Sequence, residues 1–292
     1  MTESGRQLFA RLEARRWLKD IEPRLFPEDG RPDHGEVVEV YGPEGTGKTE
    51  LLYHLLCRCV MPETAGGLEV DVVFVDTDYS LDMFRLVSIL DSRLNAGASL
   101  SMTLAGSEDA VLRSCLSRLL VVHCYSSSQL LFTLHFLETT LSSRPSLKLL
   151  LIDSISAFYW LDRSEGGASF NKQEEKLSKC SELLARLLRD YRITIFATCH
   201  TIRRGHSGPS SSASVSEPDR SHLCRSWQRL VTHRLVCSRQ EAENKLIAAD
   251  GGEGEQRSRQ VFVVHCSTSI QMGTKGSRVS SLRVTDGGVE FI

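Results

Sequence analysis

The chain has 292 residues, of which 41% are hydrophobic and 25% are charged, close to the average of globular proteins. This composition excludes a collagenous, a wholly disordered or a disulfide-stapled chain, and the length favours one large domain with appendages. The 35 Lys and Arg residues nearly balance the 37 Asp and Glu residues, for a net charge of −2. No overall basic field would hold nucleic acid, so contact with DNA would need a local patch or partner proteins.

Targeting signals and paired cysteines are missing from the sequence pattern. The N-terminal residues lack the apolar core of a signal peptide, and the longest apolar runs, such as 149–152, have only the length of a strand. We therefore expect neither secretion nor a membrane span. The nine cysteines form no CxxC pair, as is typical of reduced thiols in a cytosolic or nuclear protein. Cys57 and Cys59 would point to different faces of a predicted helix, which disfavours a shared metal ion.

Residues 1–34 are predicted to form an N-terminal arm rather than a domain. Leu8, Phe9, Leu12 and Leu18 recur in it at roughly helical spacing. Such a short helix would not bury its apolar face alone, so it would dock either on a partner or on its own domain.

From residue 36 onward, short β-rich runs alternate with helical runs. Strands are predicted at 36–41, 70–76, 118–125, 147–153 and 193–198. This alternation predicts an α/β fold with a mainly parallel sheet and helices on both faces. From Arg229 the chain has strand-like segments without helices between them, which we expect to extend the sheet in the antiparallel sense. Mobile loops are predicted at about 95–109, 201–222 and 250–256.

The strongest motif is GPEGTGKT at residues 42–49, which fits GxxxxGK[ST] between a predicted strand and a predicted helix. Its glycines let backbone amides turn toward the β- and γ-phosphates of a nucleotide, and the helix N-terminus faces the same anion. Lys48 would neutralise the γ-phosphate and Thr49 would ligate Mg²⁺, so ATP and Mg²⁺ are the predicted cofactors. A loop that keeps this shape but has lost nucleotide binding is the alternative. The predicted nucleotide-binding residues of the loop are Gly42, Pro43, Glu44, Gly45, Thr46, Gly47, Lys48 and Thr49.

Acidic residues follow two of the predicted strands. Asp153 ends an apolar run and would hold Mg²⁺ opposite Thr49, or else cap the next helix. Asp76 and Asp78 end another strand at the same edge of the sheet and could orient the water that attacks the γ-phosphate. Asp78, the candidate catalytic residue, has a shorter side chain than Glu, so hydrolysis through it would be slow or absent.

Three further positions carry competing interpretations. His200 leaves the sheet after the strand at 193–198 and could sense the γ-phosphate, or it could be an ordinary loop histidine. Tyr159 and Trp160 could form a protein interface or belong to the core.

A stripe of apolar residues at helical spacing is predicted to face the sheet. The stripe consists of Leu177, Cys180, Leu183, Leu184, Leu187 and Leu188.

Polar residues at three strand ends, with a loop directly after the last one, resemble the RecA-type strand-exchange recombinases. Residues 41–87 and 149–167 are similar to the eukaryotic paralogues of these recombinases, and the resemblance runs from about residue 35 to the C-terminus. It implies a RecA-type P-loop ATPase domain over 35–292. Asp153 then matches the family's magnesium carboxylate, Asp78 its catalytic Glu, and His200 a Gln that senses the γ-phosphate.

The same resemblance implies a nuclear accessory factor of homologous recombination. Such paralogues work in a heteromeric complex with sister paralogues, here the D-type paralogue as direct partner, and support recombinase filaments at double-strand breaks and stalled forks. Residues 162–173 and 201–220 match the family's two DNA-facing loops, and we expect 162–173 to be mobile as well. The second of these loops has no aromatic residue to stack on bases, so DNA contact would be made mainly through the complex.

Two departures from the recombinase pattern, at Asp78 and His200, favour an ATP-binding paralogue with little turnover. A DNA-stimulated ATPase is the first alternative, and a scaffold with a vestigial nucleotide site is the second.

Overall fold

The computed structural model describes residues 18, 21–98, 108–167, 169–201, 223–240, 260–268 and 276–292. Most of the predicted arm and most of the predicted loops at 95–109, 201–222 and 250–256 lie outside these residues. Across the described ranges, no helix combines the length and the apolar character that a membrane crossing requires.

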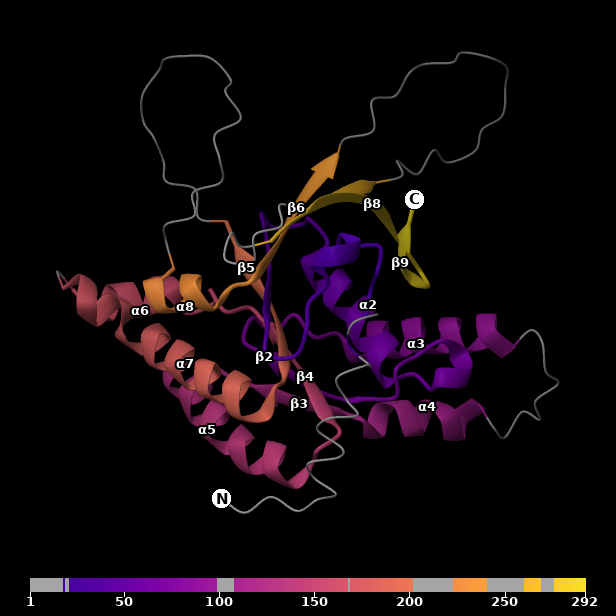
Figure 1. The fold of residues 1–292 in the computed structure, drawn as a ribbon, viewed down its shortest axis with the longest axis horizontal. Helices are drawn as coiled ribbons and strands as arrows, with labels where there is room; N and C mark the ends of the chain where they lie inside the picture. Colours follow the sequence, from indigo (N-terminus) through magenta and orange to yellow (C-terminus); the bar gives the residue numbers. More distant parts are fainter. Residues whose placement is uncertain are drawn as a thin grey trace, which may run out of the picture.

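A single sheet runs through the described residues, with the strand order β3-β2-β4-β5-β1-β6-β7-β8-β9 (Figure 1). The strands from β1 to β6 pair in parallel, and β7 to β9 continue the sheet antiparallel. Their bounds are β1 Val37–Gly42, β2 Asp71–Asp76, β3 Leu119–His123, β4 Leu147–Asp153, β5 Thr194–His200, β6 His233–Gln240, β7 Val261–Thr268, β8 Ser277–Thr285 and β9 Gly288–Phe291.

The prediction that all strands after Arg229 are antiparallel is wrong for β6. This strand pairs with β1 in parallel, with Val38 opposite His233. Parallel strands need a connection that returns from the carboxyl end of one strand to the amino end of the next, and helix α8 (Arg225–Leu230) lies in the described part of the connection from β5 to β6. The predicted parallel core with antiparallel C-terminal strands is otherwise confirmed.

Helices cover both faces of the sheet, as the alternating sequence pattern predicts (Figure 1). One hydrophobic cluster joins the sheet to α2 (Lys48–Val60), α3 (Met83–Ala98) and α4 (Glu108–Ser117). A second cluster joins the other face to α5 (Ser127–Ser143), α7 (Phe170–Tyr191) and α8. Short 3₁₀ turns, η3 (Glu28–Gly30) and η4 (Glu63–Ala65), lie in the connections. The predicted stripe on α7 faces the sheet, with Leu177 half-buried and the other five residues buried.

The described part of the N-terminal arm docks on its own domain. Leu18, Ile21, Leu25 and Phe26 are each 1% exposed and belong to the first hydrophobic cluster. Leu8, Phe9 and Leu12, the other apolar residues of the predicted helix, lie outside the described residues. The described residues from Leu18 to Phe26 therefore pack within the chain, whereas the docking of the predicted helix as a whole stays a prediction.

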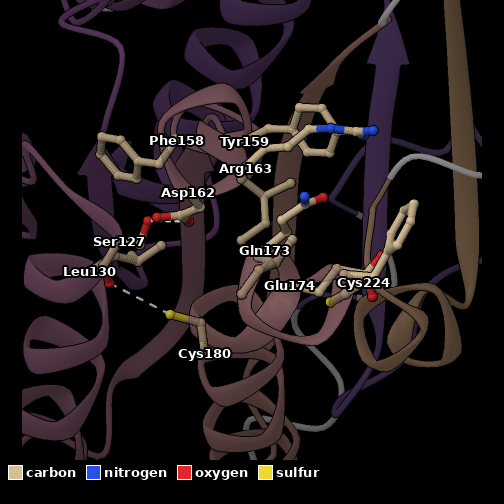
Figure 2. Close-up of a pocket in the computed structure, with 13 residues that line it drawn as sticks. Ser127, Leu130, Phe158, Tyr159, Asp162, Arg163, Gln173, Glu174, Cys180 and Cys224 are labelled. Carbon is tan, nitrogen blue, oxygen red and sulfur yellow. Dashed lines mark hydrogen bonds between the residues drawn. The ribbon is translucent and has the colours of Figure 1, made fainter. Parts of the chain in front are cut away.

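The expectation of a loop over 162–173 is only partly met. Helix α6 (Tyr159–Glu165) extends into this segment, and α7 already begins at Phe170. Asp162 is buried and lines a pocket between α5, α6 and α7, where it accepts a hydrogen bond of 2.5 Å from the Ser127 hydroxyl (Figure 2). Lys176 lies 3.2 Å from its other oxygen. The buried Ser127, 35 positions away, and the half-buried Lys176 on α7 thus hold Asp162 in place, which favours helix over loop at this end of the segment.

Candidate nucleotide-binding site

The glycine-rich loop connects the end of β1 to the start of α2. Gly45 and Gly47 have φ angles of +70° and +80°, a conformation that favours glycine. A Cβ added at Gly42 would lie 2.4 Å from the carbonyl oxygen of Cys237, so the first glycine permits close packing against β6. No side chain caps the N-terminus of α2. The first amide groups of α2 are therefore not occupied by a capping side chain, as an anion-binding helix N-terminus requires.

Lys48 is held inside this loop. Its side chain is buried, and Nζ donates hydrogen bonds to the carbonyl oxygens of Gly42 and Pro43 at 2.9 and 2.7 Å. Burial lowers the pKa of the ammonium group, while nearby groups including Asp153 act in the opposite direction. A positive group thus lies at the centre of the loop, directly before Thr49.

Asp153 is the last residue of β4 and is buried next to the loop. One of its carboxylate oxygens accepts hydrogen bonds from Thr49 Oγ1 at 2.8 Å and Ser80 Oγ at 2.7 Å, and the other accepts one from Thr198 Oγ1. The alternative role as a helix cap is wrong, because the next helix, α6, follows Phe158 and has no side-chain cap. Thr49 and Asp153, 104 positions apart, are therefore brought together as predicted.

The two acids at the end of β2 and just after it have different surroundings. Asp76 is 2% exposed, and its carboxylate accepts a hydrogen bond from the backbone N–H of Ser80 at 3.1 Å, so it holds the loop after β2. Asp78 faces the cleft beside Asp153 and lies 2.9 Å from Nε2 of His200. Of the two candidates for orienting water, only Asp78 lines the cleft.

An open cleft in two adjoining parts surrounds these residues, and Glu44, Thr49 and His200 line both parts. The part beside Asp153 also includes Trp160, whose 62% exposure rules out the interpretation of this residue as core. The part beside β7 and β8 is lined by residues that sequence reasoning missed. They are Gln260, Phe262, Arg283, Val284 and Thr285.

Phe262 and Arg85 shape the cleft from outside the motif. The Phe262 ring lies 3.6 Å from the position of a Cβ built on Gly47, so it packs directly on the loop. Arg85 on α3 donates two hydrogen bonds of 3.0 Å to the carboxylate of Glu50 on α2. It also donates to the carbonyl oxygen of Thr285 at 2.6 Å, which connects the β8–β9 turn to α2. No local sequence pattern signals either role.

The chemistry of the site fits a nucleoside triphosphate with Mg²⁺. Backbone amides and the Lys48 ammonium suit phosphate oxygens, while the Thr49 hydroxyl and the Asp153 carboxylate are the hard oxygen ligands that Mg²⁺ prefers. Such a loop between a parallel strand and a helix, facing an acid at the end of another parallel strand, is the arrangement typical of α/β domains of the RecA type, and the fold places the chain in that class.

Comparison with known proteins identifies the family to which the chain belongs. The chain belongs to the Rad51 family, whose family model matches residues 29–247. DNA repair protein XRCC2 of Mus musculus is 44% identical over 296 residues, which cover 99% of this chain and 97% of that protein. The DNA repair protein XRCC2 homolog of Arabidopsis thaliana is 27% identical, covering 80% of this chain and 76% of that protein. These matches confirm the resemblance to the recombinase paralogues.

A third relative carries a different name and matches a smaller share of both chains. DNA repair protein RAD51 homolog 4 of Bos taurus is 28% identical over 220 residues, covering 73% of this chain and 58% of that protein.

Proposed function

We propose that this chain is an ATP-binding accessory factor of homologous-recombination DNA repair that acts through assembly with other Rad51-family proteins. Membership of the Rad51 family and similarity to two proteins described as DNA repair protein XRCC2 or its homolog support the role in recombination repair. A DNA repair protein of this family would act in the nucleus.

The observation that carries the nucleotide part of the proposal is the contact between Thr49 and Asp153. Its 2.8 Å hydrogen bond brings two hard oxygen ligands together beside Lys48. Mg²⁺ with ATP, when bound, would supply the charge compensation that links the glycine-rich loop to β4. The residues of this chain would orient the phosphates through the loop amides and Lys48, and the metal through Thr49 and Asp153.

We propose that the chain hydrolyses little ATP, because Asp78 is poorly suited to orient the attacking water. Asp78 is one methylene shorter than a Glu, and its carboxylate is engaged by His200 at 2.9 Å. ATP would then act as a ligand that stabilises one shape of the domain, adding RT ln(1 + [L]/Kd) to its stability. The proposed partners are sister paralogues, with the D-type paralogue in direct contact and the strand-exchange recombinase acted on through the complex. DNA contact would also be made mainly through that complex.

The test measures ATP binding, complex yield and phosphate release for the purified heteromeric complex. Lys48→Ala removes the buried ammonium, and Lys179→Ala is the matched control because Lys179 is exposed and, among the described residues, pairs with Glu175 on the same helix. We expect wild type and Lys179→Ala to bind ATP without measurable turnover, and Lys48→Ala to lose both ATP binding and assembly.

Two other outcomes would contradict the proposal. Assembly that survives the loss of ATP binding would indicate a scaffold with a dispensable nucleotide site. DNA-dependent phosphate release that Asp78→Ala abolishes would indicate an active ATPase instead.

A further inference from the structure

One contact crosses the nucleotide cleft between residues from two different strand ends. His200 Nε2, at the end of β5, lies 2.9 Å from Asp78 Oδ2, in the segment after β2. In the sheet, β4 lies between these two strands and ends in Asp153. The contact therefore passes over the carboxyl end of β4, where the candidate metal carboxylate is located.

The contact between His200 and Asp78 depends on one N–H group of the imidazole. An ionised carboxylate only accepts hydrogen bonds, so Nε2 of His200 carries the proton and donates it to Asp78. The other ring nitrogen, Nδ1, is buried and has no hydrogen-bond partner among the described residues. A neutral imidazole has one N–H, whereas the side-chain amide of Gln has two. The Nε2–H of His200 can therefore serve Asp78 or an anion in the cleft, but not both fully.

The backbone of His200 is anchored to the glycine-rich loop and to the segment after β4. His200 is in register with Gly42, and its N–H donates to Ser156 Oγ at 2.9 Å. The Thr201 N–H donates to the carbonyl oxygen of Gly42 at 3.3 Å. The side chains of His200 and Asp78 are less restrained, because they are 36% and 27% exposed. A change of partner therefore needs only a rotation of the imidazole, with the strand held in place.

Both residues line the part of the cleft that contains Thr49 and Asp153. This is the end of the cleft where the terminal phosphate of a P-loop nucleotide would lie, because the Lys and Thr of the motif act on that phosphate and its metal. From this geometry we infer that Asp78 and His200 form a latch that responds to the terminal phosphate. A triphosphate takes the Nε2–H of His200 and releases the Asp78 carboxylate, whereas a diphosphate leaves the contact intact.

The latch would make His200 a residue that favours the binding of ATP over ADP. The Asp78 carboxylate would be released from His200 only when ATP is bound. The inference rests on the proposed nucleotide binding. It adds a specific mechanism, in which the candidate water-orienting acid and the candidate phosphate sensor hold each other until a third phosphate separates them.

The test follows the imidazole of His200 by NMR in the full chain labelled with ¹³C-histidine. The probes are Mg²⁺ with ADP and Mg²⁺ with the β,γ-imido analogue of ATP, and equilibrium dialysis measures the binding of each. His200→Gln assigns the signal by its loss. We expect the imido analogue to move the His200 signal and ADP to leave it in place. Without nucleotide, Asp78→Ala should already displace the signal from its wild-type position.

The binding data provide a second readout. His200→Ala should lower the preference for the imido analogue over ADP by about tenfold, the size of one hydrogen bond to a charged group. Asp78→Ala should raise that preference several-fold. The matched control is His123→Gln, because His123 lies 3.2 Å from Asp76 at the end of β3 and is not among the residues that line the cleft. It should leave the preference unchanged.

The possible failures are distinguishable. If both nucleotides bind but move the His200 signal equally, or not at all, the latch is overturned and the proposed function stands. If neither nucleotide binds to the wild-type chain alone, the same measurements are made on the heteromeric complex with only this chain labelled; if neither nucleotide binds there, the proposed function fails and the latch fails with it.

Discussion

Glu22→Gln tests how the N-terminal arm is anchored to the domain. Glu22 is 1% exposed, and its carboxylate lies 2.6 Å from Nε2 of His54 on α2. Arg93 on α3 donates to Nδ1 of His54 at 2.7 Å, so the hydrogen of this neutral ring is on Nε2 and points to Glu22. Arg24 pairs with both carboxylate oxygens at 2.7 and 2.8 Å. The substitution preserves shape and removes the charge.

The expected loss of stability follows from these contacts. Exchanging a charge-assisted hydrogen bond from His54 for a neutral one costs roughly 1 kcal/mol. Losing the paired contact with Arg24, which is 52% exposed, costs at most about 1 kcal/mol after solvent screening. The sum is about 2 kcal/mol, which corresponds to a fall of about 4 °C in Tm for a chain of this size. Glu28→Gln, an exposed site on the same arm, is the control and should leave Tm unchanged.

The pH dependence gives this prediction a definite sign. Burial raises the pKa of Glu22, but the hydrogen bonds from His54 and Arg24 outweigh it and hold the pKa well below the ordinary value of 4.5. The contribution of Glu22 is therefore present above pH 4.5 and is lost as the pH falls toward the folded-state pKa. The Tm difference between wild type and Glu22→Gln should shrink from about pH 5 to about pH 3. A difference that stays constant over this range would refute the reasoning.

Two substitutions and one labelling experiment test the framework around the site. Arg85→Lys keeps the charge but loses the paired hydrogen bonds to Glu50, so urea denaturation should show a loss of about 1 kcal/mol. Trp227→Phe leaves the buried Glu39 carboxylate without its 2.8 Å indole donor, and calorimetry should show destabilisation by roughly 1–3 kcal/mol; an unchanged Tm would contradict this. Burial raises the pKa of Cys57 to about 12, so a thiol reagent at neutral pH should modify Cys57 only as the chain unfolds, as mass spectrometry of the labelled peptide would show.

The contact between Thr49 and Asp153 could be predicted from sequence because it follows from periodicity. Apolar runs predict buried parallel strands, and parallel strands place their carboxyl ends at one edge of the sheet. The register of β2 against β4, with Asp76 opposite Asp153, shows this alignment directly. Residues at strand ends could therefore be grouped correctly without knowledge of the strand order.

Other features depend on partners that no local pattern reveals. Trp227 donates to Glu39 across 188 positions, and Glu22 reaches His54 across 32. The direction of β6 depends on the connection from β5, and the helix in the described part of that connection, α8, spans only six residues. The helical part of 162–173 contains Asp162, which accepts a hydrogen bond from Ser127 on another helix. In each case a polar side chain or a short connection decides the structure through a long-range contact, and the sequence shows only one side of it.

The hydroxyl groups around Asp153 show how the site combines both kinds of information. Thr49 belongs to the motif, whereas Ser80 and Thr198 come from the segment after β2 and from β5. If Mg²⁺ takes the Thr49 oxygen and the carboxylate as ligands, the hydrogen bonds from Ser80 and Thr198 remain to orient that carboxylate. Three elements of the fold thus hold Asp153 by interactions within the chain itself. Folding alone therefore sets the position of this carboxylate, and the Mg²⁺ that accompanies a nucleotide would find this ligand already in place.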